Sequence, residues 1–114
     1  MEGILKEKRR FRRIGFQVPL SYHIRGTTDY LGTLTKNISL GGMGFTSNKF
    51  SAPNTLLNLE FNILQRFFSV MAQVRWITSL PSSDNYHLGI EFLEIQPQDK
   101  RYLLEYIDIH HIDI

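Results

Sequence analysis

Apolar and polar residues alternate along most of this 114-residue chain, with the period of two that β-strands show. The first run places these apolar residues on one strand face: Phe16, Val18, Leu20, Tyr22 and Ile24. Further strands are expected over residues 30–39, 44–46, 57–63, 68–76 and 88–92, separated by turn residues. About six short strands without intervening helices favour an antiparallel barrel or sandwich. Pro19, inside the first run, indicates an edge strand or a bulge.

The alternation stops after Phe92, where a helical period replaces it. Pro97 suits the first position of a helix, and the apolar residues that recur at helical spacing are Leu103, Leu104 and Ile107. The sequence therefore predicts a helix from Pro97 to His110 that lays an apolar stripe on the barrel. We expect one mainly β domain over residues 1–114, with a flexible basic arm (1–14), a β-barrel (15–95) and a C-terminal helix (96–110).

Composition narrows the classes of protein to consider. Hydrophobic residues make up 42% and charged residues 21% of the chain, which is enough for a packed core. The chain has no cysteine, which excludes disulfides, thiolate chemistry and cysteine zinc sites. No apolar run reaches the length of a membrane span, and the N-terminus lacks the apolar stretch of a signal peptide. These features predict a cytoplasmic protein without a membrane span.

Charge is distributed unevenly. The net charge is +2, but the first 13 residues carry six Lys or Arg against two Glu, a local excess of +4. Their centre is the stretch KRRFRR, from Lys8 to Arg13, which would attract phosphate, nucleic acid or an acidic surface. The arginine fork can bond phosphate or the O6 and N7 edge of guanine through two hydrogen bonds. A solvated basic tail is the alternative, although Phe11 within the run suggests docking.

A second polar group follows on the stretch KNISLGGMGF, residues 36–45. Strict alternation would put these residues on one face of the second strand: Thr33, Thr35, Asn37 and Ser39. Gly41 and Gly42 can take positive φ and leave backbone N–H groups open to a close approach. Together they would form a hydrogen-bonding platform for a flat or anionic ligand. A simple hairpin turn remains the alternative, since Asn, Ser and Gly all favour turns.

The two groups together resemble the PilZ domain family. The spacing Arg-x-x-x-Arg occurs at Arg9 and Arg13, and Asn-x-Ser-x-x-Gly occurs at Asn37, Ser39 and Gly42. EKRRFRRI, TKNISLGGMGF, QVRWI, HLGIEF and QPQDKRYLLEYI extend the resemblance over nearly the whole chain. The resemblance implies a six-stranded antiparallel β-barrel that binds cyclic di-GMP, a bacterial second messenger. Asn37 is a departure within the allowed pattern, because many members carry Asp there.

The resemblance also implies roles for these residues. Asn37 and Ser39 would meet the guanine edge and phosphate region, and Gly42 would let the backbone approach the ligand. Arg9 and Arg13 would swing over from the arm and close the site, ordering the arm on binding. Secondary candidates for ligand contact are Lys8, Arg10, Gly41 and Trp76. For Trp76, stacking on a guanine stands beside core packing, because its strand face otherwise carries Val70, Ala72 and Val74.

The function expected on this basis is a non-catalytic receptor that signals through a separate, unidentified effector protein. No nucleophile–base pair is visible, and the four histidines are too scattered for a metal site, so we expect no enzyme activity, cofactor or metal. Two alternatives stay open. One is a small β-barrel that binds RNA or single-stranded DNA through the arm, although most aromatics fall on core-like faces. The other is a PilZ-like protein-interaction domain that binds no nucleotide.

Overall fold

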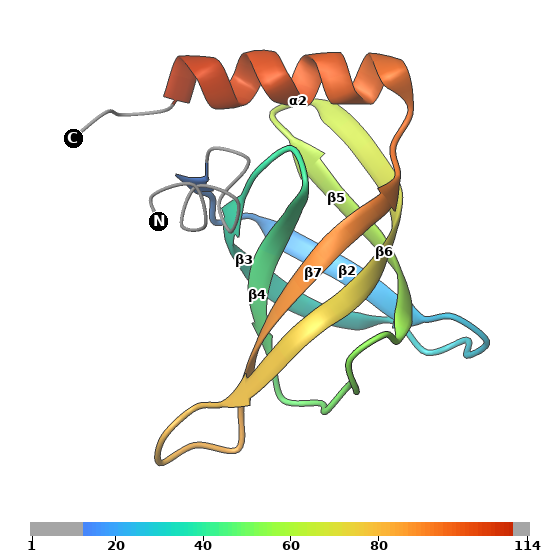
Figure 1. Ribbon diagram of the computed structural model, residues 1–114, viewed down its shortest axis with the longest axis vertical. Coiled ribbons are helices and arrows are strands. Elements are labelled where there is room, and N and C mark those ends of the chain that lie inside the picture. Colours follow the sequence, from blue (N-terminus) through green and yellow to red (C-terminus); the bar gives the residue numbers. More distant parts are fainter. Residues whose placement is uncertain (1–12, 111–114) are drawn as a thin grey trace, which may run out of the picture.

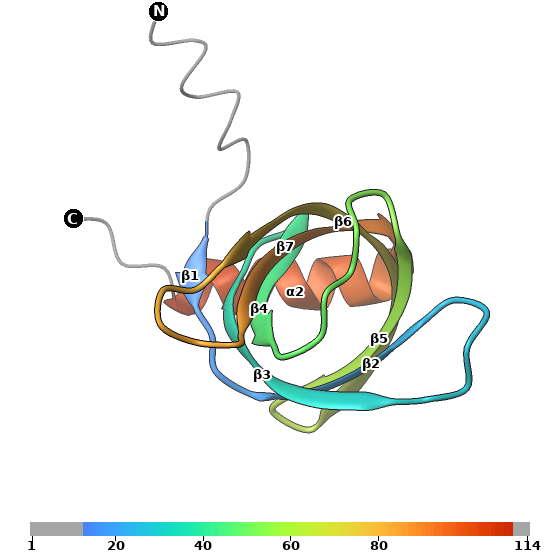
Figure 2. The same cartoon turned by 90° about the horizontal axis from the view of Figure 1, so that it is seen from below.

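The computed structural model describes residues 13–110, which form a closed antiparallel barrel and one helix (Figures 1 and 2). The strands are β1 (Ile14–Gly15), β2 (Pro19–Ile24), β3 (Leu31–Ile38), β4 (Gly42–Ser47), β5 (Leu56–Ile63), β6 (Arg66–Ser79) and β7 (Tyr86–Glu94). Hydrogen-bonded neighbours follow the order β1-β3-β2-β5-β6-β7-β4, and a β3–β4 pairing closes the ring. The expected six-stranded barrel is confirmed, and the two-residue β1 is an addition beside β3.

β1 and β2 lie one after the other along the same side of β3, with an interruption between them. The buried side chain of Thr35 holds this interruption together. Its hydroxyl donates to the carbonyl of Phe16 at 2.6 Å and accepts from the amide of Val18 at 3.0 Å. Pro19 then begins β2, where its missing N–H interrupts no ladder. β2 pairs on both sides, so the irregular entry, and not an edge position, accommodates this proline.

The barrel interior is filled by the alternating apolar residues that the sequence pattern predicts. Inward-facing residues of the first run, Phe16, Leu20 and Tyr22, are all buried. Tyr22 carries a hydroxyl into this core, where it lies 2.6 Å from the Ser47 hydroxyl. Burial raises the pKa of Tyr22, and the hydrogen bond with Ser47 opposes that rise. This polar pair is therefore satisfied inside an otherwise apolar barrel.

The helix α2 (Pro97–His110) lies across one open end of the barrel (Figure 1). Leu103 and Ile107, one helical turn apart, are buried against the barrel residues. Leu104 is 42% exposed, so its expected place in the apolar stripe is wrong. Successive helical residues point about 100° apart, and Leu104 therefore cannot share the face of its neighbour. Within residues 13–110, no helix is long and apolar enough to cross a membrane.

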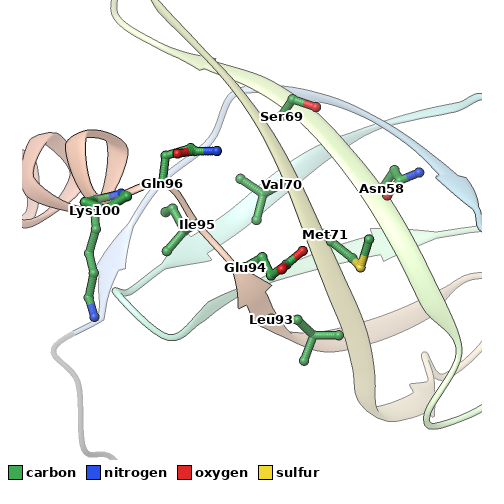
Figure 3. Close-up of a pocket in the computed structure, with 10 residues that line it drawn as sticks. Asn58, Ser69, Val70, Met71, Leu93, Glu94, Ile95, Gln96 and Lys100 are labelled. Atoms are coloured by element: carbon green, nitrogen blue, oxygen red, sulfur yellow. The ribbon is translucent and has the colours of Figure 1, made fainter.

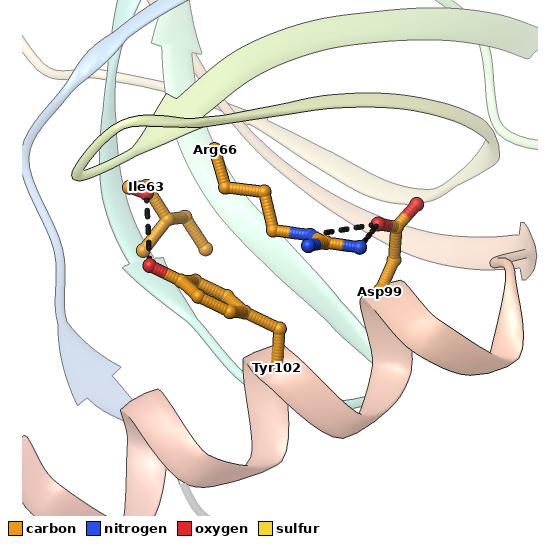
Figure 4. Close-up of polar contacts among 4 residues, drawn as sticks. All are labelled: Ile63, Arg66, Asp99 and Tyr102. Atoms are coloured by element: carbon orange, nitrogen blue, oxygen red, sulfur yellow. Dashed lines mark hydrogen bonds and ion pairs between the residues drawn. The ribbon is translucent and has the colours of Figure 1, made fainter.

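The start of α2 is tied to the β5–β6 turn (Figure 4). Arg66 donates from Nε and Nη2 to one carboxylate oxygen of Asp99, at 3.0 and 2.8 Å. Its guanidinium also lies 5.2 Å from the ring centre of Tyr102, and the Tyr102 hydroxyl donates to the carbonyl of Ile63 at 3.4 Å. Asp99 lies in the first turn, where the helix dipole favours a negative charge. These contacts fix the orientation of the helix on the barrel.

Candidate functional site

A bulge in β3 turns Asn37 to the outside of the barrel. The register of β3 against β4 shifts between Thr35 and Asn37. Thr35 is buried inside, whereas Asn37 is half-buried and Ile38 takes the next inward position. The predicted shared face of Thr33, Thr35, Asn37 and Ser39 is therefore wrong, because one extra residue in a strand inverts the alternation beyond it. The bulge presents the Asn37 amide on the outer surface.

A second bulge does the same for Trp76 in β6. The register of β6 against β7 shifts between Val74 and Trp76. Val74 is buried, whereas Trp76 is 43% exposed on the outer face. Core packing, one of the two interpretations of this tryptophan, is therefore wrong. Its ring meets that of His87 edge-on, with 5.1 Å between the ring centres.

Two glycines connect Asn37 and Trp76 across the sheet. Asn37 pairs with Gly44, Gly44 pairs with Gly89, and Gly89 pairs with Trp76, which forms one row over β3, β4, β7 and β6. A Cβ at Gly44 would lie 3.1 Å from Oδ1 of Asn37, and a Cβ at Gly89 would overlap the Trp76 indole. Both side chains thus lie over bare backbone. The ends of the row are separated by three strand spacings, or about 14 Å.

Arg13 reaches this row from the base of the N-terminal arm. Its Nη1 donates to Oδ1 of Asn37 at 2.7 Å, in an exposed contact. β1 sets this position, because Gly15, two residues further along, pairs with Asn37 itself. The structure thus brings together the last residue of the arginine motif and the first residue of the second motif. Arg9, Lys8 and Arg10 lie outside the described residues.

Ser39 occupies the turn and does not open onto the surface. It is 3% exposed, and its hydroxyl accepts from the amide of Gly41 at 3.2 Å and lies 3.4 Å from the carbonyl of Gly42. Its own amide donates to the same carbonyl at 2.8 Å. These bonds close a tight hairpin between β3 and β4. The alternative of a hairpin turn therefore describes the local role of Ser39.

Gly42 is required by the barrel wall. A Cβ at this position would overlap the carbonyl oxygen of Ile90 on β7. Within residues 13–110, positive φ among glycines is found at Gly26, so Gly41 and Gly42 do not use their freedom to take positive φ. The missing side chain of Gly42 makes room for a neighbouring strand. Gly41 contributes its carbonyl, which accepts from the amide of Phe92 at 2.8 Å.

The electrostatics around the row favour a neutral histidine and an anionic ligand. Burial, and secondly the charge of Lys36, lower the pKa of His87 below its usual value. Arg75 is paired with Glu91 at 3.5 Å, while Arg13 and Lys36 have no carboxylate partner within the described residues. An exposed indole, an amide and unpaired cations suit a planar ligand that carries negative charge. The part of the chain described contains no cluster of His, Asp or Glu able to hold a metal.

Gly44 and Gly89 are site residues that sequence reasoning missed. Gly44 belongs to the glycine-rich stretch after β3, and Gly89 is a lone glycine within the run HLGIEF. A glycine inside an alternating run is itself a signal of a bulge or a close approach. That signal could have found both positions, but it could not have named the side chains that cover them.

Comparisons with known proteins agree with this architecture. A family model described as PilZ domain matches residues 7–108. The Escherichia coli YcgR PilZ domain, in a structure with c-di-GMP, is 22% identical, with a TM-score of 0.72 over 90% of this chain and 91% of that one. The Bacillus subtilis inhibitor of motility MotI/DgrA is 23% identical, with a TM-score of 0.78 over 89% of this chain. This chain spans 50% of MotI/DgrA.

A third similar structure is that of K. pneumonia MrkH in its apo state, which is 14% identical with a TM-score of 0.73. The match covers 87% of this chain and 47% of MrkH. At these identities the structural likeness establishes the fold. A comparison with curated proteins gives no match.

Proposed function

The chain belongs to the PilZ domain family, and on that basis we propose that it is a non-catalytic receptor for cyclic di-GMP. One observation carries the proposal: the hydrogen bond of 2.7 Å from Nη1 of Arg13 to Oδ1 of Asn37. It joins the arginine motif to the Asn-x-Ser-x-x-Gly motif, although these two residues are 24 positions apart in the sequence. The structure of the YcgR PilZ domain with c-di-GMP supports the choice of ligand.

The chemistry of this contact suits a guanine nucleotide. Arginine has five N–H donors, and the bond to Asn37 uses one of them. The others can address the O6 and N7 edge of guanine or a phosphate oxygen. The Asn37 amide still offers its NH₂ group, and the exposed Trp76 ring offers a face for stacking. Adenine carries a donor where guanine has O6, so the same arginine fork favours guanine.

Ser39 and Gly42 act in this proposal through the backbone. They close the hairpin and let β4 pack against β7, which holds Asn37 at the surface beside Arg13. A contact between the Ser39 hydroxyl and the ligand would require the turn to give up its bond with the Gly41 amide. The direct contacts therefore come from Arg13 and Asn37, with Arg9 joining them from the arm.

The output of the receptor would be a changed surface. Two phosphates neutralise the basic arm, and the guanines give its arginines directional partners, so binding would order residues 8–13. A separate effector protein would then recognise the ordered arm and the adjacent barrel face. Hydrogen exchange with and without cyclic di-GMP measures this step, and unchanged exchange in the arm despite binding would contradict it.

Isothermal titration tests the ligand. We expect cyclic di-GMP to bind more tightly than GTP, GMP or cyclic di-AMP, and a short RNA to bind more weakly still. Arg101, which is exposed on α2 and does not belong to the row, provides the matched control: Arg101→Ala should bind cyclic di-GMP as the natural protein does. Equal affinity for cyclic di-GMP and cyclic di-AMP would contradict the recognition of the guanine O6 and N7 edge by arginine. Tighter binding of RNA would favour the nucleic-acid alternative.

A further inference from the structure

A second surface lies on the opposite side of the barrel from the Asn37–Trp76 row. Along the outer faces of β3, β2, β5 and β6, the register aligns four residues in one row: Gly32, Ser21, Glu60 and Ser69. We call these residues the floor of the outer trough. A hollow of about 410 Å³ opens over Gly32, Ser21 and Glu60 and is also lined by Pro19 and Phe67, whereas Ser69 lines the neighbouring hollow.

One wall of the outer trough is apolar and exposed. The next row toward α2 carries Leu34 and Pro19, which pair with each other, and Phe67, which pairs with Asn62. Leu34 is 48% exposed and Phe67 is 56% exposed. An exposed aromatic and an exposed aliphatic side chain on one row are the features of a contact surface.

The other wall is built from polar and aromatic groups that hold each other in place. His23 and Asn58 face each other across β2 and β5, with 3.2 Å between Nε2 and Nδ2. The ring of Tyr30 packs against that of His23, with 4.6 Å between the ring centres. Met71 pairs with Asn58 and extends this wall onto β6. The outer trough is thus bounded on both sides along its length.

Glu60 gives the outer trough its charge. It is half-buried between the two walls, and no ion pair or side-chain hydrogen bond within residues 13–110 involves it. A carboxylate that loses part of its water without gaining a partner is unfavourable, and a cation seated on it removes that cost. The charge of the floor therefore selects a Lys or Arg side chain.

The outer trough continues beyond β6. A hollow of about 690 Å³ begins at Ser69 and Asn58 and extends past Met71 and Leu93 to the start of α2 (Figure 3). From β3 to β7 the combined groove crosses four strand spacings, or about 19 Å. An extended segment of about six residues covers that length at roughly 3.3 Å per residue.

The β5–β6 turn at the end of the apolar wall has an unusual residue. Leu64 has φ of 57° and is 73% exposed. Leucine is strained in this left-handed region, which Gly or Asn occupies readily. Its exposed apolar side chain also gains no stabilisation from burial here. The strained, exposed Leu64 thus lies at the end of the apolar wall, beside the row that carries Phe67.

We propose that the outer trough binds an extended segment of a partner protein. The segment places a Lys or Arg on Glu60 and an apolar side chain against Phe67 and Leu34. Charge complementarity at Glu60 and the apolar wall beside it together define this partner. The proposal does not rest on nucleotide binding, because none of these residues belongs to the Asn37–Trp76 row.

A phage-displayed library of random twelve-residue peptides, selected on the full chain, tests the proposal. Enriched peptides should carry Lys or Arg within about three residues of Leu, Ile, Met or Phe. Synthetic copies of these peptides are then titrated by fluorescence anisotropy. Phe67→Ser and Glu60→Lys should each weaken binding at least tenfold. Leu104→Ser and Glu105→Gln change a matched exposed pair on α2 and should leave binding within twofold.

Three results overturn the proposal. The first is a selection that yields no basic–apolar peptide. The second is binding that Phe67→Ser and Glu60→Lys leave unchanged. The third is self-association of the natural protein in sedimentation that Phe67→Ser abolishes, since the occupant would then be a second copy of the chain. Arg13→Ala should bind the peptides normally, so loss of nucleotide binding and failure of this proposal are distinguishable.

Discussion

The indole of Trp76 lies directly on the backbone of Gly89, in the space that a Cβ at Gly89 would fill. Trp76 is the single tryptophan of the chain, so its fluorescence reports on this contact. Gly89→Ala should lift the indole off the sheet, shift its emission to longer wavelength and weaken binding of cyclic di-GMP. Gly32→Ala is the control, because nothing lies within 4 Å of a Cβ there. Unchanged emission from Gly89→Ala would contradict this packing.

Substitution of Gly42 should affect the stability of the fold, and it should affect ligand binding only through the fold. A methyl group there overlaps the backbone carbonyl of Ile90, which cannot move aside as a flexible side chain would. Gly42→Ala should therefore lower the free energy of unfolding by about 1–3 kcal/mol, the usual cost of overpacking. Urea denaturation measures this loss, again with Gly32→Ala as the control. Full stability combined with lost nucleotide affinity would instead assign Gly42 to direct ligand contact.

Arg13 and Asn37 should contribute to the binding of cyclic di-GMP as a coupled pair. Each single change to Ala should reduce affinity by roughly 1–3 kcal/mol if a directional contact to guanine is lost. Their contact is exposed, so the stability of the unliganded protein should hardly change. In a double-mutant cycle measured by calorimetry, the double variant should lose less binding free energy than the sum of the two single losses. The difference should be about 0.5 kcal/mol or more. Strictly additive losses would show that the two residues bind independently.

His87 should make the protein less stable in mild acid. Because burial lowers its pKa in the folded state, the unfolded chain takes up the proton first as pH falls. Stability is therefore full above the unfolded pKa of about 6.5 and falls as pH drops from there through the folded value. Urea unfolding at pH 7.5 and 5.5 should show a larger loss for the natural protein than for His87→Gln. Equal losses would mean that His87 does not carry this pH dependence.

The barrel and the helix could be predicted from the sequence because each depends on a regular pattern. Alternation fixed the inward residues of the first run, and Pro97 marked the first residue of α2. The two bulges could not be predicted in this way. One extra residue before Asn37, and another before Trp76, inverts the alternation, and no residue type within β3 or β6 marks either place, because Gly44 and Gly89 lie on the partner strands. The motif residues were visible in the sequence, but which of them face outward depends on those bulges.

β1 anchors the base of the basic arm beside Asn37, because Gly15 pairs with Asn37 and Ile14 pairs with Ile38. Arg9 is four residues from Arg13, so the backbone between them spans at most about 14 Å. In the proposed receptor, the guanidinium of Arg9 would therefore meet a nucleotide bound beside Asn37 at an effective concentration on the order of millimolar. Closure of Arg9 over the nucleotide would then be an intramolecular event, and its strength would depend on the length of chain between Arg9 and Arg13. Residues inserted between Arg9 and Arg13 would lower the effective concentration of Arg9 at the site without removing any group that contacts the ligand.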